Sequence, residues 1–369
     1  MPRVVVGVSL VSLVLCGTSL VACSDGVAPI LTPVAGGAVG ASRTAGLPPL
    51  AYGVHTSELP GLDTYYIDAF NDWGEVVGET GPTDSVSVAF HWQIQRGITQ
   101  LFVPGSTGSG AVDVTDDGEV AVLPFYANAP YQAARWSWGG AFQLLPLVST
   151  WSLPLPDSQP NCFPVRINIH HVILGYCQVI GLSPSVVTVW TASGRPTPVF
   201  FSGGAVLQGY PQGLSDEGIA VGRQVTTAGT EVAFVYNMNT GAYASLPVPS
   251  GAVTTGAYAV NDSGWVVGGT NIGCGHIAAW LSGRTYHDVG VCGLPTGISN
   301  DGTVVGVTED TTTFVEYAFI WTPDSGVRRL PGVTAHDFSS QAIAINRVHQ
   351  VLGTVEIAGV QHAVIWTLP

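Results

Sequence analysis

The sequence predicts an all-β fold made of repeated four-stranded antiparallel units, and three observations support this prediction. The same short pattern recurs seven times along the 369 residues. Each copy has a turn that begins with Asn, Ser or Thr, then a Val-rich stretch, then an Ala-rich stretch that ends in an aromatic residue. Charged residues make up only 10% of the chain, as suits many buried strands joined by tight turns.

A tight turn joins the first two predicted strands of every repeat. At 71–74 and 261–264, Asn takes the first place and Gly the fourth place of a type I turn, where Gly can adopt a positive φ. His171 and His349 fill the Gly place in two repeats, and we expect them to adopt the positive φ rather than bind a metal. The turns begin at Asn71, Thr115, Asn168, Ser215, Asn261, Ser299 and Asn346.

A third and a fourth strand complete each predicted unit. The third strand ends in an aromatic residue, at Trp92, Trp136, Trp190, Tyr236, Trp280, Trp321 and Trp366. The fourth strand is typified by residues 326–332. Successive turns are about 38 to 53 residues apart, which is the period of a propeller blade. We therefore predict a seven-bladed β-propeller, with six or eight blades as the alternatives.

The two ends of the repeat array predict how the ring closes. The last repeat stops just after its third strand, at Trp366, so it lacks a fourth strand. Residues 53–61 resemble the fourth-strand segment at 326–332, and both end in Leu-Pro-Gly. We expect the N-terminal strand to complete the last blade, which would leave no long unpaired sheet edge.

The N-terminus predicts export and a lipid anchor. Residues 4–21 form an apolar run after Arg3, too short for a settled membrane span, which predicts a signal peptide over 1–22. The run ends in Leu-Val-Ala-Cys, which resembles the bacterial lipobox and marks Cys23 as the lipidated residue. The alternative is an ordinary secretory signal cleaved nearby. Residues 23–49 predict a flexible tether and residues 50–369 the propeller, so we expect membrane contact only through the anchor.

Four cysteines predict two disulfides. Cys162 and Cys177 lie symmetrically about the turn at residues 169–170, and Cys274 and Cys292 lie symmetrically about Gly283. Disulfides imply an oxidising compartment. A zinc site built from Cys274, Cys292 and the nearby His276 and His287 is the alternative, but the spacing fits no familiar zinc module. We expect no metal and no other cofactor.

Composition excludes several functions. The net charge is −14, and none of the basic residues is Lys, so nucleic acid and acidic polymers are poor partners. The chain has no G-x-S-x-G, H-E-x-x-H, EF-hand or Rossmann pattern, and we assign no catalytic residue. The acids that recur in the turns are interpreted as solvent-exposed turn residues: Asp72, Asp117, Asp216, Asp262 and Asp301.

The repeat resembles the bacterial extracellular HAF repeat. Its pattern runs apolar-Asn-Asp-x-Gly-x-Val-Val-Gly and later His-Ala-Phe-x-Trp. The closest copies are residues 260–268 and 362–366, and the resemblance spans residues 50–369. The copies depart from the pattern at Val122, which replaces the closing Gly, and at Arg135 beside Trp136. The resemblance implies a secreted or surface-bound protein and no established reaction.

Three departures from the repeat suggest ligand-binding residues. Most repeats have a small residue at the position two residues before the turn. The second repeat has Asp113 there, and the third repeat has Arg166. On adjacent first strands these would form either a structural ion pair or a polar ligand site. Trp73 and Trp265 lie in turn regions, and Trp151 lies in an insert at 148–160. Each of these aromatic residues is either a binding residue or harmless surface variation.

These observations predict a monomeric recognition or scaffold module on the bacterial cell envelope, facing the periplasm or the exterior. Its partner would be an envelope or extracellular protein or a polysaccharide. One alternative is a carbohydrate-active enzyme in the propeller channel that uses Asp113 with another acid, although the aligned first-strand places supply no second unusual acid. A purely structural spacer is the other alternative.

Overall fold

A computed structural model describes residues 51, 53–62, 65–80, 87–148, 160–179, 182–200, 205–273, 275–281, 285–310, 312–333 and 339–369. The compact unit that contains them runs from Pro48 to Pro369. The predicted signal peptide and tether, with Cys23, lie outside the described residues, as do Trp151 and Cys274. All regular elements of the described residues are β-strands, and no helix among them is long and apolar enough to cross a membrane.

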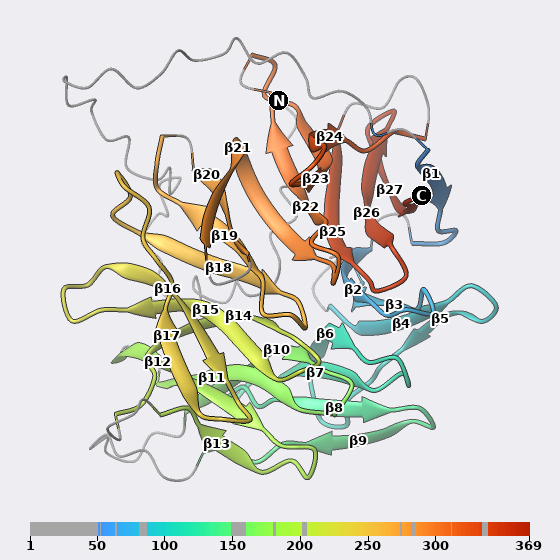
Figure 1. Ribbon diagram of the computed structural model, residues 1–369. Helices are drawn as coiled ribbons and strands as arrows, with labels where there is room; N and C mark the ends of the chain where they lie inside the picture. The colour runs from blue at the N-terminus through green and yellow to red at the C-terminus, as the bar shows by residue number, and fades with distance from the viewer. Residues whose placement is uncertain are drawn as a thin grey trace, which may run out of the picture. The chain divides into compact units, whose positions relative to one another are not determined.

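The described strands form five separate four-stranded sheets and one seven-stranded sheet, and every pairing is antiparallel (Figure 1). The first two sheets are β2 (Tyr66–Phe70), β3 (Val76–Glu79), β4 (Ala89–Gln93), β5 (Gly97–Gln100), and β6 (Gly108–Val114), β7 (Val120–Phe125), β8 (Ala134–Ser137), β9 (Ala141–Leu144). The next two are β10 (Asn161–Ile167), β11 (Ile173–Val179), β12 (Leu182–Trp190), β13 (Pro196–Pro198), and β14 (Gly209–Leu214), β15 (Ile219–Val225), β16 (Glu231–Asn237), β17 (Ala242–Ser245).

The remaining strands belong to the seven-stranded sheet and to a sheet that joins the two ends of the described chain. The seven strands are β18 (Thr255–Val260), β19 (Val266–Thr270), β20 (His276–Leu281), β21 (Thr285–Ile298), β22 (Val304–Glu309), β23 (Glu316–Thr322) and β24 (Gly326–Arg329). The other sheet has the order β1 (His55–Glu58), β27 (Val360–Thr367), β26 (Gln350–Ile357), β25 (Ser340–Ile345).

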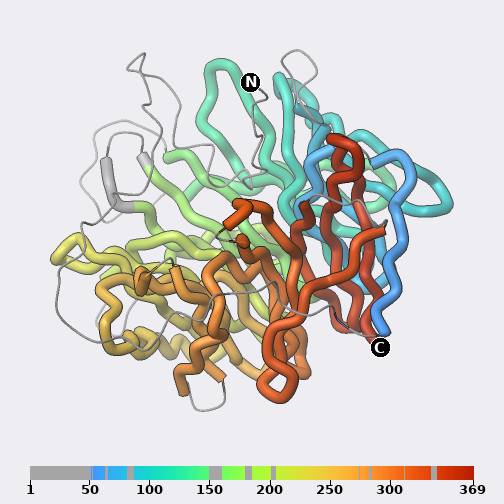
Figure 2. The backbone as a smooth tube through the Cα atoms, turned by 90° about the horizontal axis from the view of Figure 1, so that it is seen from above, coloured from blue at the N-terminus to red at the C-terminus, as the bar shows by residue number. Residues whose placement is uncertain are grey.

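The sheets are arranged as the blades of a propeller ring. The first strands of successive repeats contact one another in cyclic order, namely β2, β6, β10, β14, β18, β21, β25 and again β2. These strands therefore surround the centre, and the later strands of each repeat lie outside them. In the view from above, the chain passes around the ring in sequence order, and β1 in blue lies beside the red C-terminal strands (Figure 2).

The prediction of seven separate four-stranded blades is wrong, because repeats five and six share one sheet. The single strand β21 is 14 residues long. Its first part pairs with β20 as a fourth strand, up to Cys292 opposite His276. Its last part pairs with β22 as a first strand, from Gly293 opposite Thr308. Repeat five is the shortest in the sequence. No connecting loop therefore separates its last strand from the first strand of repeat six.

Strand β1 occupies the fourth-strand place of the last sheet. It pairs with β27, with His55 opposite Thr367. The N–H of Leu59 donates to the carbonyl of Ala363 at 2.8 Å, just as Leu330 donates to Ala318 at 2.9 Å after β24. The N-terminal and C-terminal strands of the described chain therefore lie in one sheet.

A β-bulge recurs in the first strand of every repeat, three residues before the turn. Its residues are Asp68, Val112, Val165, Gln212, Tyr258, Thr296 and Ile343. The bulge brings the first strand's backbone close to the second strand. A Cβ atom at Gly268, for example, would overlap the carbonyl oxygen of Gly256. This approach explains the closing Gly of the repeat.

The turns have the predicted conformation. Gly74 and Gly264 adopt φ values of 74° and 75°, and the N–H of Gly74 donates to the carbonyl of Asn71 at 3.1 Å. His171 and His349 adopt φ values of 56° and 59°, which confirms that they replace Gly in the turn.

The aromatic residue of each third strand packs between neighbouring sheets. Trp190, Trp280 and Trp366 are fully buried. Their indole N–H groups donate across the junction to the carbonyl oxygens of Pro146, Pro247 and Pro331, at 3.0, 3.0 and 2.6 Å. Each of these prolines follows a buried Leu at the end of a fourth strand. The Leu-Pro pair and the next repeat's Trp therefore join adjacent sheets.

One predicted disulfide is confirmed. Cys162 and Cys177 are opposite each other in β10 and β11 and are bonded, with a Cα–Cα distance of 4.1 Å. Cys292 is also disulfide-bonded. Because Cys274 lies outside the described residues, the pairing of Cys274 with Cys292 stays a prediction.

Candidate functional site

Side chains from the seven turns join neighbouring repeats at one end of the ring. At five of the seven junctions, the residue in the second place of one turn donates its backbone N–H to a side-chain oxygen in the second place of the next turn. Asp72 donates to Asp116 at 3.0 Å and Asp216 donates to Asp262 at 2.9 Å. Where the first turn residue is Asn, its amide also crosses the junction, as from Asn71 to the carbonyl of Thr115 at 3.0 Å.

Arg347 connects several of these turns. Its Nε lies 2.8 Å from Oδ2 of Asp72, its Nη1 lies 3.1 Å from Oδ2 of Asp216, and its Nη2 contacts Asp116. Hydrogen bonding to Asp72 raises the pKa of Arg347, so the guanidinium stays charged. One cation from the last repeat therefore holds three carboxylates from the first, second and fourth repeats.

The interpretation of the turn acids as solvent-exposed turn residues is wrong for Asp72, Asp216 and Asp262, which accept hydrogen bonds from a neighbouring turn. Sequence reasoning also missed Asp116 and Arg347. A signal was present, because Arg347 is the only basic residue in the second place of any turn. Its carboxylate partners are far away in sequence, and only the ring brings them together.

Asp113 and Arg166 lie close together on β6 and β10, but no ion pair within the described residues joins them. The carboxylate of Asp113 accepts the N–H groups of Val114 at 3.0 Å and Ile167 at 2.9 Å, so it bridges two sheets. Burial raises the pKa of Asp113 to about 6, and the charge of Arg166 counteracts part of this effect. The guanidinium of Arg166 donates to the carbonyl of Val165 at 2.8 Å.

A second unusual acid, Asp68, stands near this pair. Burial raises the pKa of Asp68 well above its usual value, as do Glu79 and Asp113, while Arg166 lowers it. Its Oδ2 is buried without a hydrogen-bond partner. The expectation that Asp113 is the one unusual acid on the first strands is therefore wrong. Asp68 was missed because it occupies the bulge place, one residue before the place of Asp113.

The two turn tryptophans have different environments. Trp73 is 77% exposed at the turn between β2 and β3. Trp265 is half-buried and packs in the core cluster that includes Ile298 and Trp321. Its ring also lies against Gly302 of the next turn, where a Cβ atom would overlap it. Trp265 thus fills a junction between repeats, and Trp73 presents its ring to solvent.

An open groove lies between the outer strands of the first two sheets, and we call it the Trp138 groove. Its volume is about 480 Å³. Aromatic side chains line it together with a few polar ones: Arg96, Thr99, Gln100, Phe102, Trp136, Trp138 and Phe142. Trp138 is 43% exposed, and the Cζ atom of Arg96 lies 4.9 Å from the centre of its ring. The sequence marks Trp138 as a tryptophan outside the repeated aromatic place, but the groove itself was not predicted, because β5 and β9 meet only in the fold.

Two buried rings, those of Trp136 and His91, pack against Trp138. Trp136 meets it edge-on with ring centres 5.5 Å apart, and His91 does so at 5.2 Å. His91 is held by Glu75, whose Oε2 lies 3.2 Å from Nε2. Burial lowers the pKa of His91, although Glu75 raises it, so the imidazole is neutral near pH 7. The exposed aromatic surface is therefore rigid before any ligand arrives.

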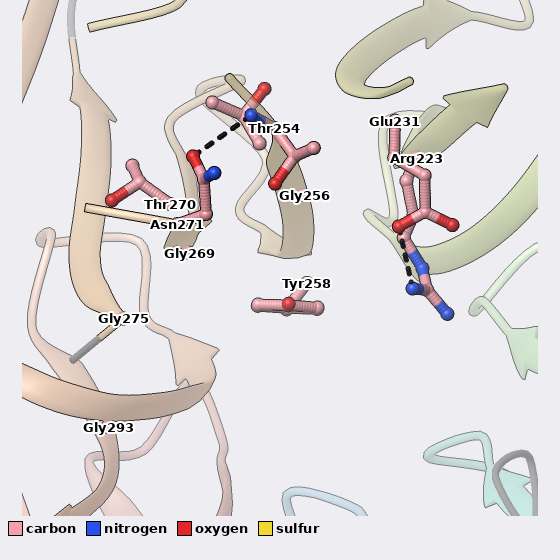
Figure 3. A pocket seen from close by; sticks show the side chains of 11 residues that line it. Arg223, Glu231, Thr254, Gly256, Tyr258, Gly269, Thr270, Asn271, Gly275 and Gly293 are labelled. Atoms are coloured by element: carbon pink, nitrogen blue, oxygen red, sulfur yellow. Dashed lines mark hydrogen bonds and ion pairs between the residues drawn. The ribbon is translucent and has the colours of Figure 1, made fainter. Parts of the chain in front are cut away.

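A smaller cavity, the Tyr258 pocket, lies between β15–β16 and β18–β19 and has a volume of about 170 Å³ (Figure 3). Tyr258 stands on one side, and the ion pair of Arg223 with Glu231, at 3.0 Å, stands across the gap. Asn271 accepts the N–H of Thr254 at 3.0 Å above them. Burial raises the pKa of Tyr258, so its hydroxyl stays protonated.

No group of three or more His, Cys, Asp or Glu side chains is placed to hold a metal ion within the described part of the chain. His276 approaches Asp288 at 2.9 Å, across β20 and β21.

Comparison with known proteins shows the fold alone. The chain matches no protein-family model, and no curated protein matches it. It is similar to the structure of an oligogalacturonate lyase from Vibrio parahaemolyticus, with a TM-score of 0.56 and 12% identity over 83% of this chain and 90% of that one. It is also similar to the β-propeller domain of the Trilobed protease from Pyrococcus furiosus, with a TM-score of 0.52 and 10% identity over 82% and 95% of the two chains.

A third similar structure is a puromycin-hydrolyzing peptidase from Mycobacterium tuberculosis, with a TM-score of 0.55 and 12% identity. The match covers 82% of this chain but only 52% of the peptidase, so the chain spans about half of that protein's length. At such low identities these likenesses carry no activity with them. Together with the sheet order, they establish that the described chain is a β-propeller of four-stranded antiparallel blades.

Proposed function

We propose that this protein is a recognition module that binds a neutral polysaccharide through the Trp138 groove. The observation that carries the proposal is the exposed, rigidly held ring of Trp138 in an open groove with Thr99 and Gln100. Sugar rings present an apolar face to an aromatic ring and a rim of hydroxyl groups to polar side chains. An open groove of this kind can accommodate a polymer as well as a small molecule.

Charge favours a neutral polymer. The protein carries a net charge of −14, which repels acidic polysaccharides over long range. Arg96, the cation of the groove, is stacked over Trp138, and its charge interacts with the ring. Binding to the groove would then depend on stacking and hydrogen bonds to uncharged hydroxyl groups.

The location and full architecture belong to the same proposal. The sequence 20–23 supports lipidation at Cys23, and the HAF-like repeats support a place on the bacterial cell envelope. The cyclic contacts of the first strands support seven repeats, with β21 shared by two of them, and the pairing of β1 with β27 supports closure of the ring. A closed ring on a tether would present the groove to the periplasm or the exterior.

A binding screen of the full chain against neutral and acidic envelope polysaccharides tests the proposal. We expect saturable binding to a neutral polysaccharide that weakens about tenfold or more in Trp138→Ala, because an exposed aromatic anchor is lost. The matched control is Trp73→Ala, which removes a more exposed tryptophan outside the groove and should leave binding unchanged. Both variants should keep the melting temperature within a few degrees, measured by circular dichroism.

Three outcomes would overturn the assignment. Binding that survives Trp138→Ala but is lost in Trp73→Ala would move the site to the turn end of the ring. Preferential binding of acidic polysaccharides would reject the charge argument. Binding only to envelope proteins, or to nothing in the screen, would favour a scaffold or a spacer.

A second candidate function is cleavage of a glycan in the channel, and one observation favours it. Asp68 joins Asp113 as a second acid with a raised pKa near the centre of the ring, and paired carboxyl groups are what glycoside hydrolysis requires. Release of reducing ends from a polysaccharide, abolished in both Asp68→Asn and Asp113→Asn, would support this enzyme. No release by the wild-type protein would remove it.

A further inference from the structure

The Tyr258 pocket exists because one pair of facing residues has no side chains. In each repeat, the fifth residue before the turn is opposite the residue that follows the closing Gly. In the third repeat this pair is Phe163 and Tyr176, with rings stacked 5.0 Å apart. In the fourth it is Tyr210 and Arg223, with the guanidinium 5.3 Å from the ring centre.

In the fifth repeat both members of the pair are glycines, Gly256 and Gly269. Glycine inside a strand costs about 0.5 to 1 kcal/mol relative to alanine, so two opposite each other need a structural reason. The ring of Tyr258 supplies part of it. A Cβ atom on Gly256 would lie 3.3 Å from the Tyr258 hydroxyl, and one on Gly269 would lie 3.2 Å from Cε2 of the ring.

The glycine pair therefore holds the Tyr258 ring against the sheet, and space remains beside it. That space of about 170 Å³ is similar to the cavity of about 150 Å³ that holds one benzene ring in an engineered protein. The pocket has room for one six-membered ring.

The residues that line the pocket indicate which kind of six-membered ring it can bind. Arg223 and Glu231 cancel each other's charge, and they are the charged members of the lining. The Nε of Arg223 is buried without a hydrogen-bond partner, which leaves one donor for a ligand. Asn271 lines the pocket and uses its carbonyl oxygen for the N–H groups of Val253 at 2.8 Å and Thr254 at 3.0 Å, so the oxygen is occupied and the amide NH₂ is the group left to donate (Figure 3).

We propose that the Tyr258 pocket binds one neutral pyranose ring, with its apolar face on Tyr258 and its hydroxyl groups on Arg223, Glu231 and Asn271. The ring is either a free monosaccharide or the end of a glycan chain. An anionic sugar would meet the carboxylate of Glu231, and a cationic one the guanidinium of Arg223. This inference extends the proposed recognition function to a second site, and its test does not depend on the Trp138 groove.

The test is saturation-transfer NMR on the full chain with single sugars. The neutral probes are D-glucose, D-galactose, D-mannose and N-acetyl-D-glucosamine, and the charged probes are D-glucuronate and D-glucosamine. We expect millimolar binding of at least one neutral sugar and weaker binding of the charged ones. Arg223→Met with Glu231→Met, which keeps net charge and similar volume, should weaken binding about tenfold because hydrogen bonds are lost.

Two further variants make the result decisive. Tyr258→Leu removes the aromatic face while keeping an apolar side chain, and it should also weaken binding if the double variant proves too unstable to study. Trp73→Ala, an exposed change that lies in neither proposed site, should leave binding of single sugars unchanged. No transfer from any neutral sugar, equal binding of charged sugars, or unchanged binding in folded pocket variants would overturn this proposal. None of these results would affect the groove.

Discussion

The side chains in the second place of the turns connect neighbouring repeats of the ring. Asp72, Asp216 and Asp262 each accept a hydrogen bond from a backbone N–H of the preceding turn. These carboxylates therefore connect adjacent repeats. Arg347 stands in the same place and neutralises three carboxylates at once. A network of this kind contributes more than an isolated surface ion pair, because one cation serves several anions.

Glu79 predicts how stability depends on pH. Burial raises the pKa of Glu79 from 4.5 to about 7, although a hydrogen bond with Ser87 lowers it. The folded state therefore holds the proton more tightly than the unfolded state. The stability that this proton contributes is complete below pH 4.5 and is lost as the pH rises through 7.

Glu79→Gln, which cannot ionise, should exceed the wild type in unfolding free energy by about 3 kcal/mol at pH 8 and match it near pH 4. Chemical denaturation at the two pH values measures this difference. Glu58→Gln, an exposed change on β1, is the control and should have little effect at either pH. A variant that is less stable than the wild type at pH 8 would show that the charged form is favoured in the fold.

At the scale of elements, the bulge of the first strand and the closing Gly of the second strand face each other and together set how closely the two strands approach. The first strand bulges in every repeat, and in six of the seven repeats the facing residue of the second strand is a Gly whose added Cβ atom would overlap the first strand's backbone. The bulge residue, which is Asp68 in one repeat and Tyr258 in another, belongs to the first strand, and the first strands surround the centre of the ring. Both the carboxyl cluster and the Tyr258 pocket therefore depend on this local geometry.

Gly268→Ala should destabilise the protein by about 2 kcal/mol or more, because its Cβ atom would overlap the backbone carbonyl of Gly256. Thermal unfolding measures the effect. Gly97→Ala, at a turn glycine with no atom within 4 Å of the added Cβ, is a control for turn strain and should cost less. Equal losses in the two variants would mean that the first strand can move away from β19.

At the scale of the whole molecule, the first and the last strand of the described chain pair in one sheet. His55 and Thr367 are opposite each other in β1 and β27, and both are exposed. The sheet that contains them is built from strands at the start and the end of the described chain. Because the first strands contact each other cyclically, separation of β1 from β27 would expose the edge of the last sheet.

A disulfide across this pair tests the closure. The double variant His55→Cys with Thr367→Cys should form a bond under oxidising conditions and raise the unfolding free energy by about 5 kcal/mol, the upper end of the range for disulfides, because the closed loop is very long. Comparison of melting temperatures before and after mild reduction measures the gain, with the wild-type protein as control for its own disulfides. Failure of the thiols to couple in the folded protein would contradict the pairing of β1 with β27.

The sequence by itself determined the local features of this protein. The Asn-x-x-Gly turns, the positive φ of His171, and the bond between Cys162 and Cys177 all follow from residues close in the chain, where spacing and turn chemistry decide the geometry. It also predicted the repeated four-stranded sheets, because the repeat is long enough for four short strands. Only the tertiary structure decided what depends on contacts between repeats, because distant residues meet only when the ring forms. The Arg347 cluster, the merger of two repeats through β21, the Trp138 groove and the Tyr258 pocket all arise in this way.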